Sequence, residues 1–511
     1  MGARLEHVDP RVVVSLAAAA AAVLRFPGAL YPLGPDESGY TIVARNWDPS
    51  PASVYGDYFV DRPPALIGLF GLSDALAGPG LVRVVGALSC AVLVLLAAAT
   101  ARAALRYAGV GDQRFQARTG AWTAVLTAAF TSSALIDPVM VKGEVLGIPW
   151  VVGSFWLVIR TLERPDGRTA YVQACGAGFA ASFALGMKQN LVAGLVFGVV
   201  LLVGARLTRR IASRDLWRLG SAALIGALLP VLATVSWATA ADVRLEELWY
   251  TVFGFRSDAL AVIAAGSSDA PLDRALQILG IVLATGMGFV VAGVVIHRNR
   301  IARIDPALLA ATTLVLVVDV GGLLLGGSFW RPYLFALVPG MVLCTTLLLA
   351  ARDHVARRAR LLIVLAGITS VLSSAVWLLL YESGVGTAVE VRSGEAIAEA
   401  AQPGDSILVY GGRADLVLAS GLPTPYPYLW SLPMRTLDPD LEQLQTLLSG
   451  PDAPTWVVMA APGGSWDGLA DVIRPALDER YDVHGEVCNG RYAYLRADAE
   501  RPPLTPDCDE T

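Results

Sequence analysis

Charged residues are scarce in this sequence. Asp, Glu, Lys and Arg make up only 16% of its 511 residues, whereas 55% are hydrophobic and the mean hydropathy is +0.56. Soluble proteins carry about a quarter charged residues, so this composition argues against a water-soluble protein. The formal net charge of -5 leaves no basic surface of the kind that binds nucleic acid. A membrane protein with several spans is the class that remains.

Common catalytic signatures are also missing. The four histidines and five cysteines are not spaced as zinc ligands. The phosphate loop Gly-x-x-x-x-Gly-Lys-Ser/Thr is absent, and so is the Gly-x-Ser-x-Gly motif. The sequence therefore gives no support to zinc, P-loop or serine-nucleophile chemistry of these patterns.

Long apolar runs recur along the first 381 residues. A span needs about 20 apolar residues, and about eleven segments qualify. Arginines crowd the loops after every second segment, which predicts a cytoplasmic N-terminus and an extracytoplasmic C-terminus. We expect the first run to be retained, because Arg25 and Phe26 stand where a signal-peptide cleavage site needs small residues. The segments are centred near Ala19, Val92, Val125, Val152, Gly178, Phe197, Leu224, Ala284, Leu314, Val342 and Ile368.

The C-terminal part has a different pattern. Short apolar runs alternate with Gly, Pro and Asp turns and with a helical stretch from Asp438 to Leu448, which predicts a small α/β domain outside the membrane. The apolar runs are SILVY at Ser406, WVVMA at Trp456 and YAYLR at Tyr492.

These patterns predict an α-helical polytopic membrane protein with a C-terminal extracytoplasmic α/β domain. The membrane domain would cover residues 1–381, with long outer loops at 27–78 and 239–272, and the exported domain residues 382–511. Cys488 and Cys508 share the exported domain, where oxidation is permitted. Their spacing leaves open whether they form a disulfide.

The first outer loop carries charged residues close to the apolar runs on both of its sides. Asp36 and Glu37 are adjacent, and Asp61 and Arg62 precede Pro63-Pro64 at the return to apolar sequence. The simplest interpretation is a solvated, proline-stiffened loop. The length of the loop, the carboxylate pair at the membrane surface and the rigid Arg-Pro-Pro return favour a functional site.

Lysine is almost absent. Of 39 basic residues only two are lysines, Lys142 and Lys188, and the predicted topology puts both on the outer side. Lys142 lies between Asp137 and Glu144, and Lys188 lies in GMKQN between two apolar runs. A compact ammonium can bind phosphate. The alternative for Lys188 is an interfacial lysine that snorkels to the membrane surface.

Four cations therefore stand at span ends on the outer side, where few are expected. Arg331, in GGSFWRPYLFALVP, is the fourth. An anion held at this interface would explain them. Pairing with Asp36, Glu37, Asp61 or Glu144 is the alternative. The other three of these four outer-side cations are Arg62, Lys142 and Lys188.

The order of these features resembles the GT-C superfamily of membrane glycosyltransferases, closest in pattern to protein O-mannosyltransferases and lipid A aminoarabinose transferases. The matching features are the outer Asp-Glu pair, the basic-Pro-Pro return, the Lys-Gln of MKQN and the W-R-P-Y-L element. The tail phrases PGDSILVYGG and SGLPTPYPY also resemble bacterial members. The family more often has Lys where this chain has Arg62 and His where it has Arg331, but a cation is kept at both positions.

The resemblance implies a transferase that moves a pentose or hexose from a polyprenyl-phosphate donor. The abundance of Ala, Gly and Arg suggests a GC-rich genome, and with an actinobacterial envelope mannose and arabinofuranose would be candidate sugars. The acceptor would be a hydroxyl of an envelope glycan, lipid or protein on the outer face of the cytoplasmic membrane, and the reaction would invert the anomeric centre. Asp36 is implied as the general base and Glu37 as its support. The implied binding residues are Arg62, Lys188 and Arg331 at the donor phosphate, Asp137, Lys142 and Glu144 at the sugar, and Asp61 and Tyr333 beside them.

The resemblance implies no firm cofactor and leaves a divalent metal ion open. Two other classes fit part of the sequence. A transporter or flippase of a lipid-linked anion would line a path with the same cations, but it predicts charge inside the spans. A non-catalytic scaffold would use its tail to bind an envelope polymer. The one-sided clustering of charged groups favours the transferase.

Overall fold

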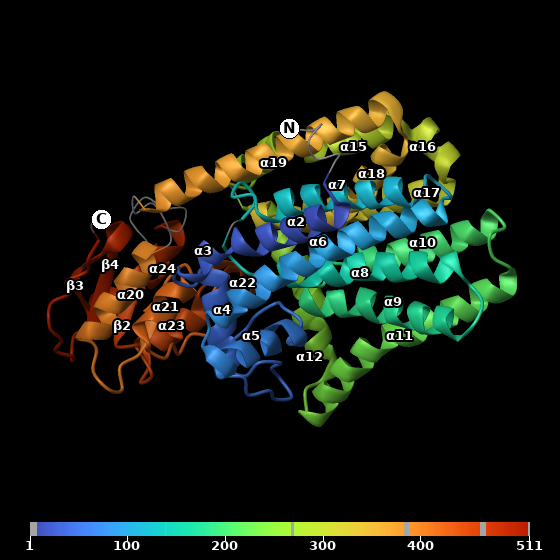
Figure 1. Cartoon of the computed structure of the whole chain (residues 1–511). Coiled ribbons are helices and arrows are strands. Elements are labelled where there is room, and N and C mark those ends of the chain that lie inside the picture. The colour runs from blue at the N-terminus through green and yellow to red at the C-terminus, as the bar shows by residue number, and fades with distance from the viewer. Residues whose placement is uncertain (1–7, 138, 267–269, 383–387, 460–466, 509–511) are drawn as a thin grey trace. The chain divides into compact units, whose positions relative to one another are not determined.

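Figure 1 shows the computed structural model of the chain, which describes residues 8–137, 139–266, 270–382, 388–459 and 467–508. The chain forms two compact units. The first comprises residues 1–29, 82–236 and 269–377, and the second comprises residues 30–81, 237–268 and 378–511. The second unit thus contains most of both predicted outer loops. It also contains residues 378–511, the C-terminal segment. The predicted boundary between residues 381 and 382 stays a prediction.

The first unit is a bundle of apolar helices. Long helices such as α8 and α9 run side by side along most of their lengths (Figure 1). Its helices are α2 (Pro10–Val23), α3 (Phe26–Ala29), α6 (Leu81–Tyr107), α7 (Gln113–Thr131), α8 (Gly143–Glu163), α9 (Arg168–Met187), α10 (Ala193–Leu207), α11 (Ser213–Ala240), α14 (Ala270–Ala284), α15 (Met287–Ile296), α16 (Arg298–Ile304), α17 (Pro306–Leu325), η2 (Arg331–Leu337), α18 (Val338–Ala350) and α19 (Asp353–Glu382).

Among the described residues, fewer helices are long and apolar enough to cross a membrane than the about eleven spans predicted from the sequence. Every predicted centre lies on a helix, and the chain is a multi-pass membrane protein. By length and composition, however, eight helices of the described chain can cross a membrane, or nine if the bent pair α14 and α15 is one span. The other two predicted spans are α10, which has only 15 residues, and α7, whose buried face carries threonines.

Glycine lets two helices of the bundle touch. A Cβ at Gly178 of α9 would overlap the carbonyl of Ala223 in α11, and a Cβ at Gly226 of α11 would overlap the carbonyl of Cys175 in α9. The two backbones therefore meet at a contact that only glycine permits on either side.

The second unit contains a small sheet and short helices. The strands have the order β1-β2-β4-β3, with β1 parallel to β2 and the other neighbours antiparallel. This sheet and its helices form the predicted α/β fold. The elements are α4 (Pro35–Arg45), α5 (Pro64–Ala77), α12 (Leu245–Trp249), η1 (Tyr250–Gly254), α13 (Phe255–Ala265), α20 (Ala388–Ala400), β1 (Ile407–Val409), α21 (Ala414–Ser420), α22 (Ser431–Leu437), α23 (Glu442–Ser449), β2 (Trp456–Met459), α24 (Asp467–Arg480), β3 (Tyr481–Val487), η3 (Cys488–Gly490) and β4 (Arg491–Arg496).

The C-terminal segment matches the sequence pattern at its strands but not at its helix start. The three apolar runs form β1, β2 and β4. The helix expected from Asp438 begins only at Glu442, because Leu441 has a left-handed φ of 54° and the Asp438 carboxylate accepts hydrogen bonds from Gln443 N and Leu444 N, both at 3.1 Å. Cys488 and Cys508 form a disulfide.

Candidate functional site

The adjacent carboxylates lie in the first turn of α4, where the helix dipole favours negative charge. Glu37 is fully buried, and its Oε2 accepts a hydrogen bond from Gly34 N at 3.0 Å. This contact caps the start of the helix. Asp36 is only half-buried. Of the two carboxylates, Asp36 is therefore the one that a substrate can reach more easily.

Asp36 is held by a residue that is distant in sequence. Trp430 Nε1 donates a hydrogen bond of 3.0 Å to Asp36 Oδ1 across 394 positions. The indole also packs against the Tyr40 ring, with 5.7 Å between ring centroids. The C-terminal segment thus contributes directly to the surroundings of the Asp-Glu pair.

A second carboxylate in this unit holds two arginines. Arg62 Nη1 lies 2.7 Å from Asp61 Oδ1, and Arg256 of α13 pairs with Asp61 Oδ2. Arg62 Nε also donates to the Tyr40 hydroxyl at 2.9 Å. Asp61 thus brings two guanidinium groups together, and guanidinium groups bind anions such as phosphate through charge-assisted hydrogen bonds.

The first unit holds the other predicted site residues. Lys188 follows α9 directly and pairs with Glu144 in the first turn of α8. Both are buried, with 7% and 1% of their surface exposed, and Lys188 Nζ lies 4.2 Å from the centroid of the Tyr333 ring. Lys188 is thus engaged by a carboxylate and an aromatic face, unlike a lysine that snorkels to an interface.

Asp137 shapes the loop before α8. Its Oδ1 accepts hydrogen bonds from Val139 N and Met140 N, both at 3.0 Å, and Arg25 Nη1 donates to its backbone carbonyl at 3.1 Å. Burial raises the pKa of Asp137, although the charges of Lys142 and Arg25 and the two backbone hydrogen bonds oppose the rise. Within the described residues, Asp137 Oδ2 has no hydrogen-bond partner.

Arg331 is separate from these contacts. Its side chain is exposed at the start of η2, and no described residue forms a hydrogen bond or ion pair with that side chain. Tyr333, two residues later, is the member of the W-R-P-Y-L element that contacts Lys188.

The sequence-predicted site residues are therefore divided between the two units. Asp36, Glu37, Asp61 and Arg62 belong to the second unit. Sequence reasoning missed Arg256, Trp430 and Tyr40 there, and it used Arg25 only to judge signal-peptide cleavage. The predicted site residues of the first unit are Asp137, Lys142, Glu144, Lys188, Arg331 and Tyr333.

A metal site was left open by the sequence. In the part of the chain that the structure describes, no three His, Cys, Asp or Glu side chains are grouped so as to hold a metal ion. We derive no catalytic step through a metal ion.

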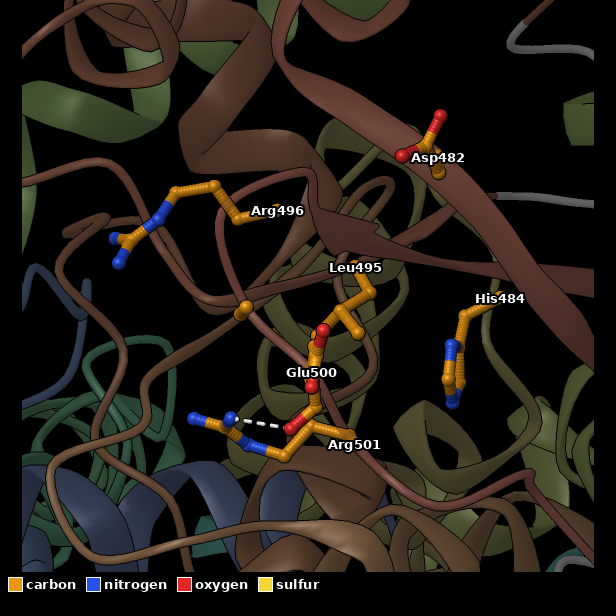
Figure 2. A pocket seen from close by; sticks show the side chains of 7 residues that line it. Asp482, His484, Leu495, Arg496, Glu500 and Arg501 are labelled. Carbon is orange, nitrogen blue, oxygen red and sulfur yellow. Dashed lines mark hydrogen bonds between the residues drawn. The ribbon is translucent and has the colours of Figure 1, made fainter.

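A separate pocket lies in the C-terminal segment. Its volume is about 400 Å³, and Figure 2 shows His484 across it from Glu500 and Arg501. Charges of both signs line it, and none of the predicted site residues does, so it is not the candidate site. The lining residues are Asp482, His484, Leu495, Arg496, Ala499, Glu500 and Arg501.

Comparison with known proteins gives matches in structure only. No family model matches the sequence, and no curated protein matches it either. The oligosaccharyltransferase of Archaeoglobus fulgidus in the apo form has a TM-score of 0.56 at 13% identity, covering 96% of this chain and 75% of that one. ArnT from Cupriavidus metallidurans bound to undecaprenyl phosphate has a TM-score of 0.50 at 15% identity, covering 95% and 98%. At these identities the likeness is one of fold.

Proposed function

We propose that this chain, which has the fold of the GT-C superfamily to which ArnT and the oligosaccharyltransferase AglB belong, is a glycosyltransferase with a polyprenyl-phosphate sugar donor. The observation that carries the proposal is the half-buried Asp36 at the start of α4, in the same unit as the Arg62-Asp61-Arg256 group. A transferase of this kind needs a base for the acceptor and fixed cations for a phosphate leaving group. One similar structure contains undecaprenyl phosphate, and another contains dolichol-phosphate with an inhibitory peptide.

The proposed reaction is a single displacement. Asp36 takes the proton of the acceptor hydroxyl as its oxygen attacks the anomeric carbon of the donor. The bond between that carbon and the phosphate oxygen breaks, and the lipid phosphate leaves with one more negative charge. Arg62 and Arg256 stabilise that charge. The attack inverts the anomeric centre.

The first-unit residues complete the proposal. Lys188 and Arg331 are proposed to bind the donor phosphate, and Asp137, Lys142 and Glu144, with Tyr333, to bind the sugar. The sugar is proposed to be a pentose or hexose, and the acceptor a hydroxyl of an envelope glycan, lipid or protein. The reaction is proposed to take place on the outer face of the cytoplasmic membrane.

Asp36→Asn tests the proposal. Loss of a general base lowers a rate by about a hundredfold to ten-thousandfold. We expect purified Asp36→Asn to release polyprenyl phosphate from polyprenyl-phosphate mannose or arabinose at least a hundredfold more slowly than the wild type, with octyl glycosides as acceptors. Asp57→Asn, which changes an exposed carboxylate of the same segment, is the control and should remain active. Equal turnover of Asp36→Asn and wild type would reject the role of Asp36.

One observation favours the transporter alternative. Asp319 lies buried within α17, and its Oδ2 has no hydrogen-bond partner among the described residues. Buried carboxylates inside spans often mark transport paths. A transporter would move a lipid-linked sugar across reconstituted liposomes without consuming it, and Asp319→Asn would stop the movement.

A further inference from the structure

We infer that Trp430 is a positioning residue for the general base, and that the C-terminal segment thereby takes part in catalysis. The inference rests on the proposed function of Asp36. The indole N–H donates to Asp36 Oδ1 at 3.0 Å. A hydrogen bond to one carboxylate oxygen limits rotation of the carboxylate and stabilises its charged form.

The position of the indole is enforced by two glycines. A Cβ at Gly39, on the same helix as Asp36, would overlap Cζ2 of the Trp430 ring. A Cβ at Gly412, whose φ is +77°, would lie 2.7 Å from Trp430 Cα. Trp430 is therefore held against α4 on its ring side and against the loop after β1 on its backbone side.

The start of α22 fixes the same residue from a third direction. Trp430 directly precedes Ser431, the first residue of α22, and its carbonyl accepts a hydrogen bond of 3.2 Å from Met434 N. The indole thus extends from a helix start rather than from a long loop. A donor held this closely is suited to orient a reacting group, because it loses little freedom when the substrate binds.

The titratable and charged groups near this contact come from several elements of the second unit. Glu37 and Tyr40 come from α4 itself, Asp61 and Arg62 from the segment before α5, and Arg256 from α13. Trp430 carries no charge, so its removal leaves the net charge of the site unchanged. A change in pH dependence can therefore be attributed to the lost hydrogen bond.

Trp430→Phe tests the inference, because Phe keeps an aromatic ring at this position and has no N–H to donate to Asp36. It also lacks the fused-ring atoms Cζ2 and Cη2 that lie against Gly39, so a control for lost packing is needed. The acidic limb of the kcat profile reports protonation of the base. We expect this limb to move to higher pH by about one unit, equivalent to about 1.4 kcal/mol, because the charged carboxylate loses a donor. We also expect kcat to fall about tenfold, with the KM for the polyprenyl-phosphate sugar nearly unchanged.

Trp47→Phe is the matched control. Trp47 is a half-buried tryptophan of the same unit whose Nε1 donates to the Val54 carbonyl at 2.9 Å. Loss of that bond should leave the acidic limb in place. If Trp430→Phe does not fold, Gly39→Ala displaces the indole without removing it and should give the same shift.

The outcomes separate the inference from the proposed function. An inactive wild-type protein, tested with both lipid-phosphate sugars, would count against the proposed function. An active wild type whose acidic limb and kcat do not change in Trp430→Phe would overturn the inference alone. An equal shift in Trp47→Phe would also overturn it, because the effect would then be a general loss of packing.

Discussion

At the scale of single residues, the buried ion pair between Lys188 and Glu144 changes how one of the two lysines is interpreted. The sequence favoured an ammonium that binds phosphate and left pairing with Glu144 as the alternative. In the structure Lys188 pairs with Glu144, a carboxylate that is 1% exposed. A buried carboxylate that loses its cation remains charged at a high cost. Lys188 therefore has a structural role in addition to any contact with the donor.

Lys188→Met measures that structural role. We expect it to lower the free energy of unfolding by about 3 to 5 kcal/mol, because Glu144 is left buried without a partner. The double variant Lys188→Met with Glu144→Gln should recover part of the loss, since the unpaired charge is gone. The measurement is unfolding of the purified protein in SDS.

Lys142→Met is the control for this pair. Lys142 is the only other lysine and is half-buried, so its loss should cost about 1 kcal/mol or less. Wild-type stability of Lys188→Met would show that the pair with Glu144 does not stabilise the fold.

The residues that sequence analysis missed have one cause in common. Asp36 and Arg62 could be found because they stand next to Glu37 and Pro63 in a recognisable order. Trp430 and Arg256 have no such local signal, because their partners Asp36 and Asp61 are brought to them only by folding. The two partners of the hydrogen bond between Trp430 and Asp36 are 394 positions apart, so no local sequence motif contains both.

At the scale of elements, the contact between α9 and α11 depends on glycine. We expect Gly226→Ala to lower stability by about 1 to 3 kcal/mol, because the added methyl must push the two backbones apart. Gly220→Ala on the same helix is the control, since its Cβ would meet no described atom within 4 Å. That change should be neutral or slightly stabilising, as alanine favours helices. Equal melting temperatures of the two variants would contradict the close contact.

Hydropathy predicted most long helices but not the helices of the first outer loop. The segment predicted to be a long outer loop contains α4 and α5. The start of α4 has a physical signal, Pro35 followed by two acids, which fits a helix N-terminus. Its buried face, which includes Tyr40 and Val43, packs against α5 and α21, so the helix depends on tertiary contacts that hydropathy cannot reveal.

At the scale of the whole molecule, the orientation proposed from the arginine loops determines on which side catalysis takes place. Ala52 lies in the first predicted outer loop and Gln113 in a predicted inner loop, and both are exposed. In a background with Cys90, Cys175 and Cys344 replaced by alanine, a membrane-impermeant maleimide should label Ala52→Cys in intact cells. It should label Gln113→Cys only after the membrane is opened. The reverse pattern would invert the topology and move the proposed reaction to the cytoplasmic face.

The threonines of α7 have a consequence for how the protein is made. Thr123, Thr127 and Thr131 each donate to the carbonyl four residues earlier, at 2.8 to 3.0 Å, and all are buried. A newly synthesised helix with such a face enters lipid less readily than its neighbours. It packs against α2, which is made before it, and against α18, which is made long after it. During synthesis, α7 would therefore have α2 to pack against first, and its contact with α18 would form only after α18 emerges from the ribosome.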